Sequence, residues 1–398
     1  MIKYVKSKST ALKNLLLDPS HLDILVRNIS RVGFPVLSDA EHLDEAVNWL
    51  CRAHDATGKK GVSAGYMMTR GWQPPYPETT GYIIPTFLKY AELKNNDKFR
   101  QRAIEMGEWE LEIQYDDGSV ASGIGTEGKP MVFNTGQVMI GLQALYETTG
   151  DDRFLEGSKK AGDWLVDIQS EKGDWNKHVY CDIPHSYHSR VAWPLADLYR
   201  ITGEKKYKNA AIKNVEWVLS VTEENGWSKY MAFDKYQSPF THTIAYTFRG
   251  LLECAALLPE VNESAIKVVT TGMEKILEKF ENRSANPVTG HEYLPSRLNM
   301  HWQSRDKESC ITGNAQLSIV FMKLYELSGN ASYFSAAQRL IDHVKKTQSL
   351  KSVNQNVKGA IPGSFPIWGN YLSLIYPNWA AKFFADAQMF KMKLLENG

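Results

Sequence analysis

The stretch Leu145-Tyr146-Glu147-Thr148-Thr149-Gly150 recurs as Leu198-Tyr199-Arg200-Ile201-Thr202-Gly203 and as Leu324-Tyr325-Glu326-Leu327-Ser328-Gly329. An aromatic residue follows each glycine after four positions, at Phe154, Tyr207 and Tyr333, and Asn95 with Phe99 repeats this spacing once more. Glycine and asparagine accept the left-handed backbone conformation that ends many helices. The repeat therefore predicts helices that end at these residues, each followed after a tight turn by an antiparallel helix.

The spacing of the repeat predicts six helical hairpins. Phe99, Phe154 and Tyr207 lie 55 and 53 residues apart, and the 126 residues from Tyr207 to Tyr333 leave room for one divergent hairpin between them. We expect the first helices of the hairpins at residues 79–93, 135–148, 187–201, 241–257, 311–328 and 369–376. We expect the second helices near residues 98–114, 154–169, 207–222, 264–281, 332–347 and 380–394, after an extra helix near 41–53.

The two helices of a hairpin differ in their hydrophobic pattern. The first helices are apolar or small on all sides, as in residues 136–142 and 315–321, whereas the second helices are amphipathic, as in residues 158–166. A helix that is apolar all round belongs inside a protein, and one with a single apolar stripe belongs at its surface. The chain is therefore predicted to be all-α: an (α/α)6 toroid, with an inner ring of six helices inside an outer ring. We expect one catalytic domain at 41–398 after an N-terminal arm at 1–40.

Composition excludes several function classes. A net charge of +1 leaves no basic excess for binding nucleic acid or an anionic membrane surface. The four cysteines are scattered without metal-ligand spacing, so we expect no metal and no cofactor. No apolar run approaches the ~20 residues of a membrane span, and the N-terminus lacks a signal-peptide core, so a cytoplasmic location is expected.

The hairpin count, the Asn134-Thr135-Gly136-Gln137 opening and the aliphatic-Tyr-x-x-Thr-Gly helix endings resemble the six-hairpin glycosidase-like superfamily. That superfamily includes unsaturated glucuronyl hydrolases, sugar 2-epimerases and the toroid domains of uronate polysaccharide lyases. The resemblance spans roughly residues 40–395. It implies a carbohydrate-active enzyme with a polysaccharide or oligosaccharide substrate, but leaves the reaction open because one toroid hosts several chemistries.

In such toroids the inner helices begin around a common cavity, which we call the mouth. Six helix N-termini directed at one cavity favour an anionic ligand. The densest group of reactive side chains before such a helix is His185-Ser186-Tyr187-His188-Ser189-Arg190. We predict His188, His185, Tyr187 and Tyr236 as catalytic residues. We predict as substrate-binding residues Asn134, Arg190, Tyr76, Glu78, Asp174, Trp175, His242, Trp302 and Trp368.

Three functions compete on these residues. In the first, a His takes the proton beside the carboxylate of a uronic-acid glycan, Asn134 and Arg190 neutralise that carboxylate, and a Tyr serves as the acid. This chemistry, which makes a lyase or a C5-epimerase, is the preferred prediction. The alternative is a glycoside hydrolase, which needs two carboxyl groups across the scissile bond; Glu78 and Asp174 are available. A non-catalytic glycan-binding toroid is the third possibility, which the titratable mouth disfavours.

Overall fold

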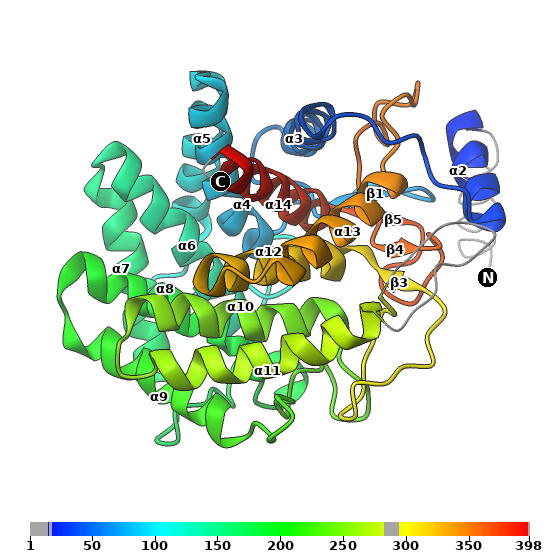
Figure 1. Ribbon diagram of the computed structural model, residues 1–398. Coiled ribbons are helices and arrows are strands. Elements are labelled where there is room, and N and C mark those ends of the chain that lie inside the picture. Colours follow the sequence, from blue (N-terminus) through cyan, green and yellow to red (C-terminus); the bar gives the residue numbers. More distant parts are fainter. Residues whose placement is uncertain (1–14, 16–17, 282–293, 397–398) are drawn as a thin grey trace, which may run out of the picture.

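The computed structural model describes residue 15 and residues 18–281 and 294–396. Its helices are arranged in two concentric rings (Figure 1). The inner ring consists of α4 (Pro77–Lys94), α6 (Val132–Thr149), α8 (Ser189–Thr202), α10 (Thr241–Leu257), α12 (Ile311–Ser328) and α14 (Asn378–Glu396). The outer ring consists of α3 (Asp39–Asp55), α5 (Asp97–Ile113), α7 (Asp152–Asp167), α9 (Lys205–Ser220), α11 (Asn262–Glu281) and α13 (Ala331–Thr347). The predicted (α/α)6 toroid is confirmed.

Short elements gather where the inner helices begin. Strands β2 (Gly71–Trp72), β1 (Gly65–Met67) and β5 (Ile375–Pro377) form an antiparallel sheet in that order, and β3 (Ser309–Cys310) pairs with β4 (Ser364–Phe365). Two 3-10 turns, η1 (Tyr180–Asp182) and η2 (Ser186–His188), precede α8. Because the long connections from outer to inner helices all lie at this end, they form the mouth.

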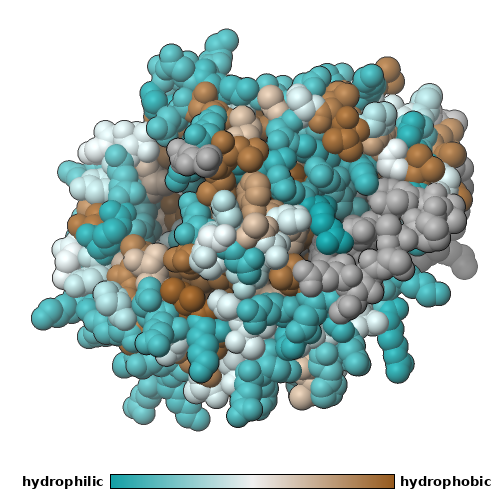
Figure 2. Space-filling view, in the orientation of Figure 1, coloured by the Kyte–Doolittle hydropathy of each residue, from teal (hydrophilic) through white to brown (hydrophobic). Residues whose placement is uncertain are grey.

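Of the expected N-terminal arm, residues 1–14, 16 and 17 lie outside the described residues. The rest contains α2 (Pro19–Ser30), which packs on the segment before α14, where the Ile367 N–H donates to Asn28 Oδ1 (2.7 Å). The face shown in Figure 2 is mainly hydrophilic over α9 and α11, in the lower part of the view. No helix in the described part of the chain combines the length and apolar character that a membrane span requires.

The predicted helix ends are confirmed at four positions. Gly150, Gly203 and Gly329 have φ angles of 70°, 75° and 68°, and Asn95 has a φ of 46°, so all four adopt the left-handed conformation. The divergent hairpin is α10–α11, since α10 ends at Leu258 in an extended conformation instead. Five of the six predicted hairpins therefore stand, with boundaries shifted by a few residues.

The sixth predicted hairpin is wrong. Residues 369–376 form turns and most of β5 rather than an inner helix, and the predicted outer helix at 380–394 is the inner helix α14. Helix α14 lies between α12 and α4 and packs on α3, the helix that we expected only to lead into the first hairpin. The reason is that α14 carries small and apolar residues toward three neighbours at once, including Ala380, Ala381 and Phe384, and so fills the gap in the inner ring.

Side-chain amides link neighbouring outer helices. Gln169, just after α7, donates from Nε2 to the carbonyl oxygens of Gly173 (3.0 Å) and of Ala210 in α9 (3.0 Å). Gly173 has a φ of +92°, and a Cβ there would lie 2.2 Å from the Lys213 carbonyl oxygen of α9, so only glycine fits. Gln114 repeats the arrangement between α5 and α7.

The same amide link closes the ring. Gln348, the equivalent residue after α13, donates to the carbonyl oxygens of Gly359 (2.7 Å) and of His42 in α3 (3.2 Å), and its Oε1 lies 2.5 Å from His42 Nδ1. Helix α3, from the beginning of the chain, thus takes the position of the next outer helix after α13.

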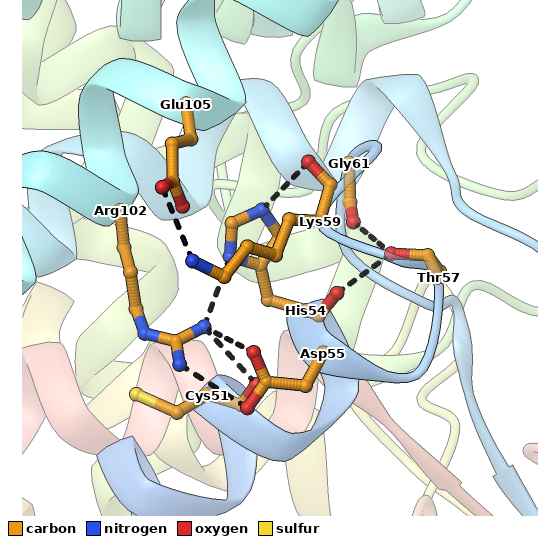
Figure 3. Close-up of polar contacts among 8 residues, drawn as sticks. All are labelled: Cys51, His54, Asp55, Thr57, Lys59, Gly61, Arg102 and Glu105. Atoms are coloured by element: carbon orange, nitrogen blue, oxygen red, sulfur yellow. Dashed lines mark hydrogen bonds and ion pairs between the residues drawn. The ribbon is translucent and has the colours of Figure 1, made fainter.

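On its other side α3 contacts α5 through an ionic cluster in which His54 is buried and Asp55 is exposed (Figure 3). Arg102 of α5 donates to Asp55 (2.8 and 3.1 Å) and to His54 Nδ1 (3.2 Å). The other ring nitrogen of His54 lies 3.2 Å from the Lys59 carbonyl oxygen, to which it donates as Nε2–H. Burial, and secondly the Arg102 charge, lower the pKa of His54 to about 4. His54 is therefore neutral in the folded protein at physiological pH.

Replacing Gln348 by methionine should lower the free energy of unfolding by about 1–3 kcal/mol, because the buried carbonyl groups of His42 and Gly359 lose their donor. Urea unfolding of Gln348→Met measures this loss, with Gln101→Met at an exposed position of α5 as the matched control. Equal stability of the two variants would show that the amide link does not hold the ring closed.

The free energy of unfolding should decrease as the pH is lowered, because the folded protein keeps His54 neutral. Since its folded pKa of about 4 lies below the ordinary value near 6.5, the unfolded chain takes up a proton first. The contribution of the neutral His54 to the free energy of unfolding is complete above pH 6.5 and is lost progressively as the pH falls toward 4. Between pH 7 and pH 5 the wild type should therefore lose about 2 kcal/mol more stability than His54→Gln. His301→Gln, at an exposed position, should lose as much as the wild type; a parallel loss in all three proteins would contradict the assignment.

Candidate functional site

The inner helices bring polar side chains to the toroid axis just inside the mouth. The group, which we call the axial cluster, comprises Glu78 of α4, Gln137 of α6, Arg190 of α8, His242 and Tyr246 of α10 and Gln316 of α12. Each lies within the first four turns of a helix that is otherwise largely apolar. Such buried polar groups, drawn from separate elements, are the usual setting for shifted pKa values.

Glu78 is the acid of the axial cluster. It is the second residue of α4, and the hydroxyl of Tyr76, the residue that precedes the helix, donates to its Oε2 at 2.5 Å. Burial raises the pKa of Glu78 to about 7, while the Tyr76 hydrogen bond and the charge of Arg190 oppose this rise. A carboxyl group that is partly protonated near neutral pH can both donate and accept a proton.

Arg190 lies at the centre of the cluster and is 3% exposed. Its Nε donates to Gln137 Oε1 (2.9 Å), and its guanidinium carbon lies 4.8 Å from the ring centre of Tyr246 and 5.6 Å from that of Phe383. These ring faces favour a cation electrostatically. No ion pair joins Arg190 to an acid in the part of the chain that the structure describes.

His242 supplies a neutral imidazole. Its Nδ1 lies 2.7 Å from Gln316 Oε1, and its ring centre lies 4.3 Å from that of Tyr246 and 5.3 Å from that of Tyr371. Burial lowers the pKa of His242 to about 3, and the Arg190 charge adds to this effect. Because Nδ1 donates to the amide oxygen, the lone pair of the neutral ring is on Nε2.

The predicted catalytic residues around η2 lie together, but in an aromatic cluster. Tyr187 stacks on His185 with ring centres 4.4 Å apart, and His188 lies 5.3 Å from His185. The ring nitrogens of His185 lie 2.8 Å (Nε2) and 3.0 Å (Nδ1) from the carbonyl oxygens of Tyr180 and Ala232, so the lone pair of the neutral ring faces the backbone and not a substrate. Burial holds the pKa of His188 well below its ordinary value, and its buried Nδ1 has no hydrogen-bond partner among the described residues.

Three other predicted residues lie outside the axial cluster. Trp175 and Trp302 are fully buried and donate from Nε1 to the carbonyl oxygens of Leu165 and Asn225, so neither presents a ring face for a sugar. Tyr236 is 83% exposed on a surface loop.

Of three more predicted residues, two make local contacts and one is exposed. Asn134 donates to the Ala121 carbonyl oxygen (2.7 Å), and the buried Asp174 accepts from the Ser170 hydroxyl. Trp368 is 43% exposed and precedes β5 rather than an inner helix, because the sixth predicted inner helix does not exist.

Sequence reasoning missed Tyr246, Gln137 and Gln316, which lie inside the inner helices rather than before them. The sequence did contain a signal for the two glutamines. Gln137 and Gln316 are polar residues in helices whose other buried positions are mostly apolar or small, and a polar residue of that kind needs a partner. Among the described residues no group of three or more His, Cys, Asp or Glu is arranged to hold a metal ion.

Known structures share the fold. An unsaturated glucuronyl hydrolase specific for heparin superposes with a TM-score of 0.69 at 13% identity, covering 89% of this chain and 97% of that one. Glycosyl hydrolase family 88 from Bacteroides vulgatus gives 0.63 at 13% identity, covering 90% and 99%, and a polysaccharide lyase gives 0.63 at 13% identity, covering 91% and 99%. These structures confirm the predicted toroid fold.

No curated protein sequence is significantly similar to the chain. The family model for the beta-L-arabinofuranosidase, GH127 catalytic domain matches residues 71–279, from β2 to the last turn of α11, which is more than half of the chain. The matched part contains four of the six inner helices and most of the axial cluster. The chain therefore belongs to the family of the beta-L-arabinofuranosidase GH127 catalytic domain, carbohydrate-active enzymes of the six-hairpin type.

Proposed function

We propose that this chain is a glycoside hydrolase in which Glu78 is the general acid. The observation that carries the proposal is the half-buried Glu78 carboxyl group, which accepts a hydrogen bond from Tyr76 at the start of α4 and lies within the electrostatic influence of Arg190. Family membership supports hydrolysis more than the elimination or epimerisation that the sequence favoured. β-L-Arabinofuranosides are the first substrates to test, because the family is described by that activity.

Glu78 can act first as the general acid and then as the general base. With a pKa of about 7, a large fraction of the carboxyl groups is protonated near neutral pH and can protonate the leaving oxygen of a glycoside. After the leaving group has departed, a water molecule forms a bond to the anomeric carbon and gives its proton to the Glu78 carboxylate, which restores the acid. Tyr76 and Arg190 both favour this ionised form, so they keep the group from being protonated permanently.

The neutral members of the axial cluster suit a sugar. His242, Tyr246 and Gln316 offer donors and acceptors without net charge, which matches the hydroxyl groups of a carbohydrate. The aromatic ring of Tyr371 lies beside them and provides an apolar face.

A second candidate is elimination on a uronate glycan, favoured by one arrangement. His242 is neutral with a lone pair on Nε2, lies beside Tyr246, and is close to an Arg190 that has no acid partner among the described residues. In this alternative His242 removes the proton, Tyr246 protonates the leaving oxygen and Arg190 neutralises the uronate carboxylate.

Isotope incorporation separates the two reactions. The protein is incubated in ¹⁸O-labelled water with an aryl β-L-arabinofuranoside and, separately, with uronate oligosaccharides. A hydrolase places one ¹⁸O atom in the released sugar and creates no unsaturated product. A lyase creates an absorbing unsaturated uronate with no ¹⁸O, and this outcome would replace the proposal.

Replacing Glu78 by glutamine should reduce kcat at least a hundredfold for a glycoside whose leaving group needs a proton. A dinitrophenyl glycoside, whose leaving group departs without a proton, should retain most of its rate of bond cleavage. Glu127→Gln, at an exposed position in the loop before α6, is the matched control and should behave as the wild type. Equal losses on both substrates would exclude Glu78 as the general acid.

Replacing Tyr76 by phenylalanine should move the alkaline limb of the kcat/KM profile to higher pH. The Tyr76 hydroxyl donates to the ionised carboxylate and lowers the pKa of Glu78, so its removal lets that pKa rise and keeps the acid protonated longer. The pH dependence of kcat/KM measures the shift, and a limb that stays in place or moves to lower pH would contradict the contact.

A further inference from the structure

A cavity lies on the toroid axis, on the side of the axial cluster away from the mouth. Its volume is about 350 Å³, within the range of small-molecule sites. Each of the six inner helices contributes three residues to its wall, and we call it the axial well. The lining residues are Tyr82, Pro85, Lys89, Ile140, Ala144, Glu147, Arg190, Trp193, Asp197, Ala245, Arg249, Glu253, Gln316, Ile319, Lys323, Lys382, Phe383 and Asp386.

The well opens at the end of the toroid where the inner helices finish. Lys89 and Glu147, near the C-terminal ends of α4 and α6, are exposed, whereas Tyr82, Arg190 and Gln316, near the helix beginnings, are buried. These buried residues form the floor that separates the well from the mouth. A ligand in the well would therefore enter from the face opposite to the proposed substrate.

The acids of the well are already neutralised by cations. An oxygen of each carboxylate lies within 2.8 Å of a cationic nitrogen. One of these cations, Arg200, does not line the well. The ion pairs are Glu253 with Arg249 (2.5 Å) and Lys323 (2.8 Å), Asp386 with Lys382 (2.5 Å), and Arg200 with Asp197 (2.7 Å) and Glu147 (2.5 Å).

Arg190 on the floor of the well is buried and forms no ion pair with an acid among the described residues. Its Nε donates to Gln137, but no hydrogen bond joins its terminal nitrogens to a described residue. It is also the second residue of α8, where the helix dipole disfavours a cation. A buried guanidinium group in such a place is costly unless an anion accompanies it, and its planar fork matches carboxylate and phosphate oxygens.

We propose that the axial well is a second binding site, for a small organic anion whose phosphate or carboxylate group contacts Arg190. Trp193, Ile140, Ile319 and Phe383 give the well apolar walls, so the rest of the ligand is a compact body of about the size of a monosaccharide. The proposal does not depend on the reaction at the mouth.

Calorimetric titration of the full chain, at constant ionic strength and without substrate, tests the site. The probes are inorganic phosphate, glucuronate and, as the neutral counterpart, glucose. We expect saturable 1:1 binding of phosphate or glucuronate and none of glucose; the anion that binds more tightly identifies the preferred oxyanion. Absence of saturable binding of both anions, or equal binding of glucose and glucuronate, would overturn the proposal.

Variants distinguish the well from the mouth. Ala144→Phe places a ring in the well from α6 and should weaken binding of the anion at least tenfold, whereas Ala144→Ser preserves the space and should bind as the wild type. Ile319→Phe fills the well from α12 and replaces the first variant if that one fails to fold. Unchanged affinity in a folded filled variant would place the anion elsewhere and contradict the site.

Discussion

Three junctions of the outer ring, including the one that closes it, depend on a side-chain amide that reaches from one helix to the next. Gln114, Gln169 and Gln348 each donate to a loop glycine and to the backbone of the following outer helix. A toroid has no free edge, so the last of these links must join residues that are about three hundred positions apart in sequence. Gln348 forms that link to α3, and Arg102 joins α3 to α5 on its other side.

Closure of the outer ring holds the inner helices close together. This packing determines the pKa values of the side chains on the toroid axis. Six helices that converge on one line exclude water from the polar residues that they carry there. The same loss of hydration raises the pKa of Glu78 and lowers that of His242, because burial disfavours the charged form of either group. The fold thus keeps an acid partly protonated and an imidazole neutral within one axial cluster.

Arg190 connects the two halves of the axis. Its charge acts on Glu78 on the mouth side, and its guanidinium group also forms part of the floor of the axial well. The rings of Tyr246, Trp193 and Phe383 surround it and stabilise the cation in a site that holds no acid partner among the described residues. One side chain therefore borders both the proposed catalytic site and the proposed anion site.

The sequence alone determined five of the hairpins, the left-handed helix ends at Asn95, Gly150, Gly203 and Gly329, and the division of those five hairpins into inner and outer helices, since these follow from local backbone preferences and hydrophobic periodicity. It also placed Glu78 and Arg190 at helix beginnings. Only the tertiary structure decided that α3 completes the sixth hairpin with α14, that both ring nitrogens of His185 face the backbone, and that Tyr246 and Gln316 meet Arg190 on the axis. These facts depend on contacts between residues far apart in the chain, and a local pattern records which face of a helix is buried but not which partner buries it.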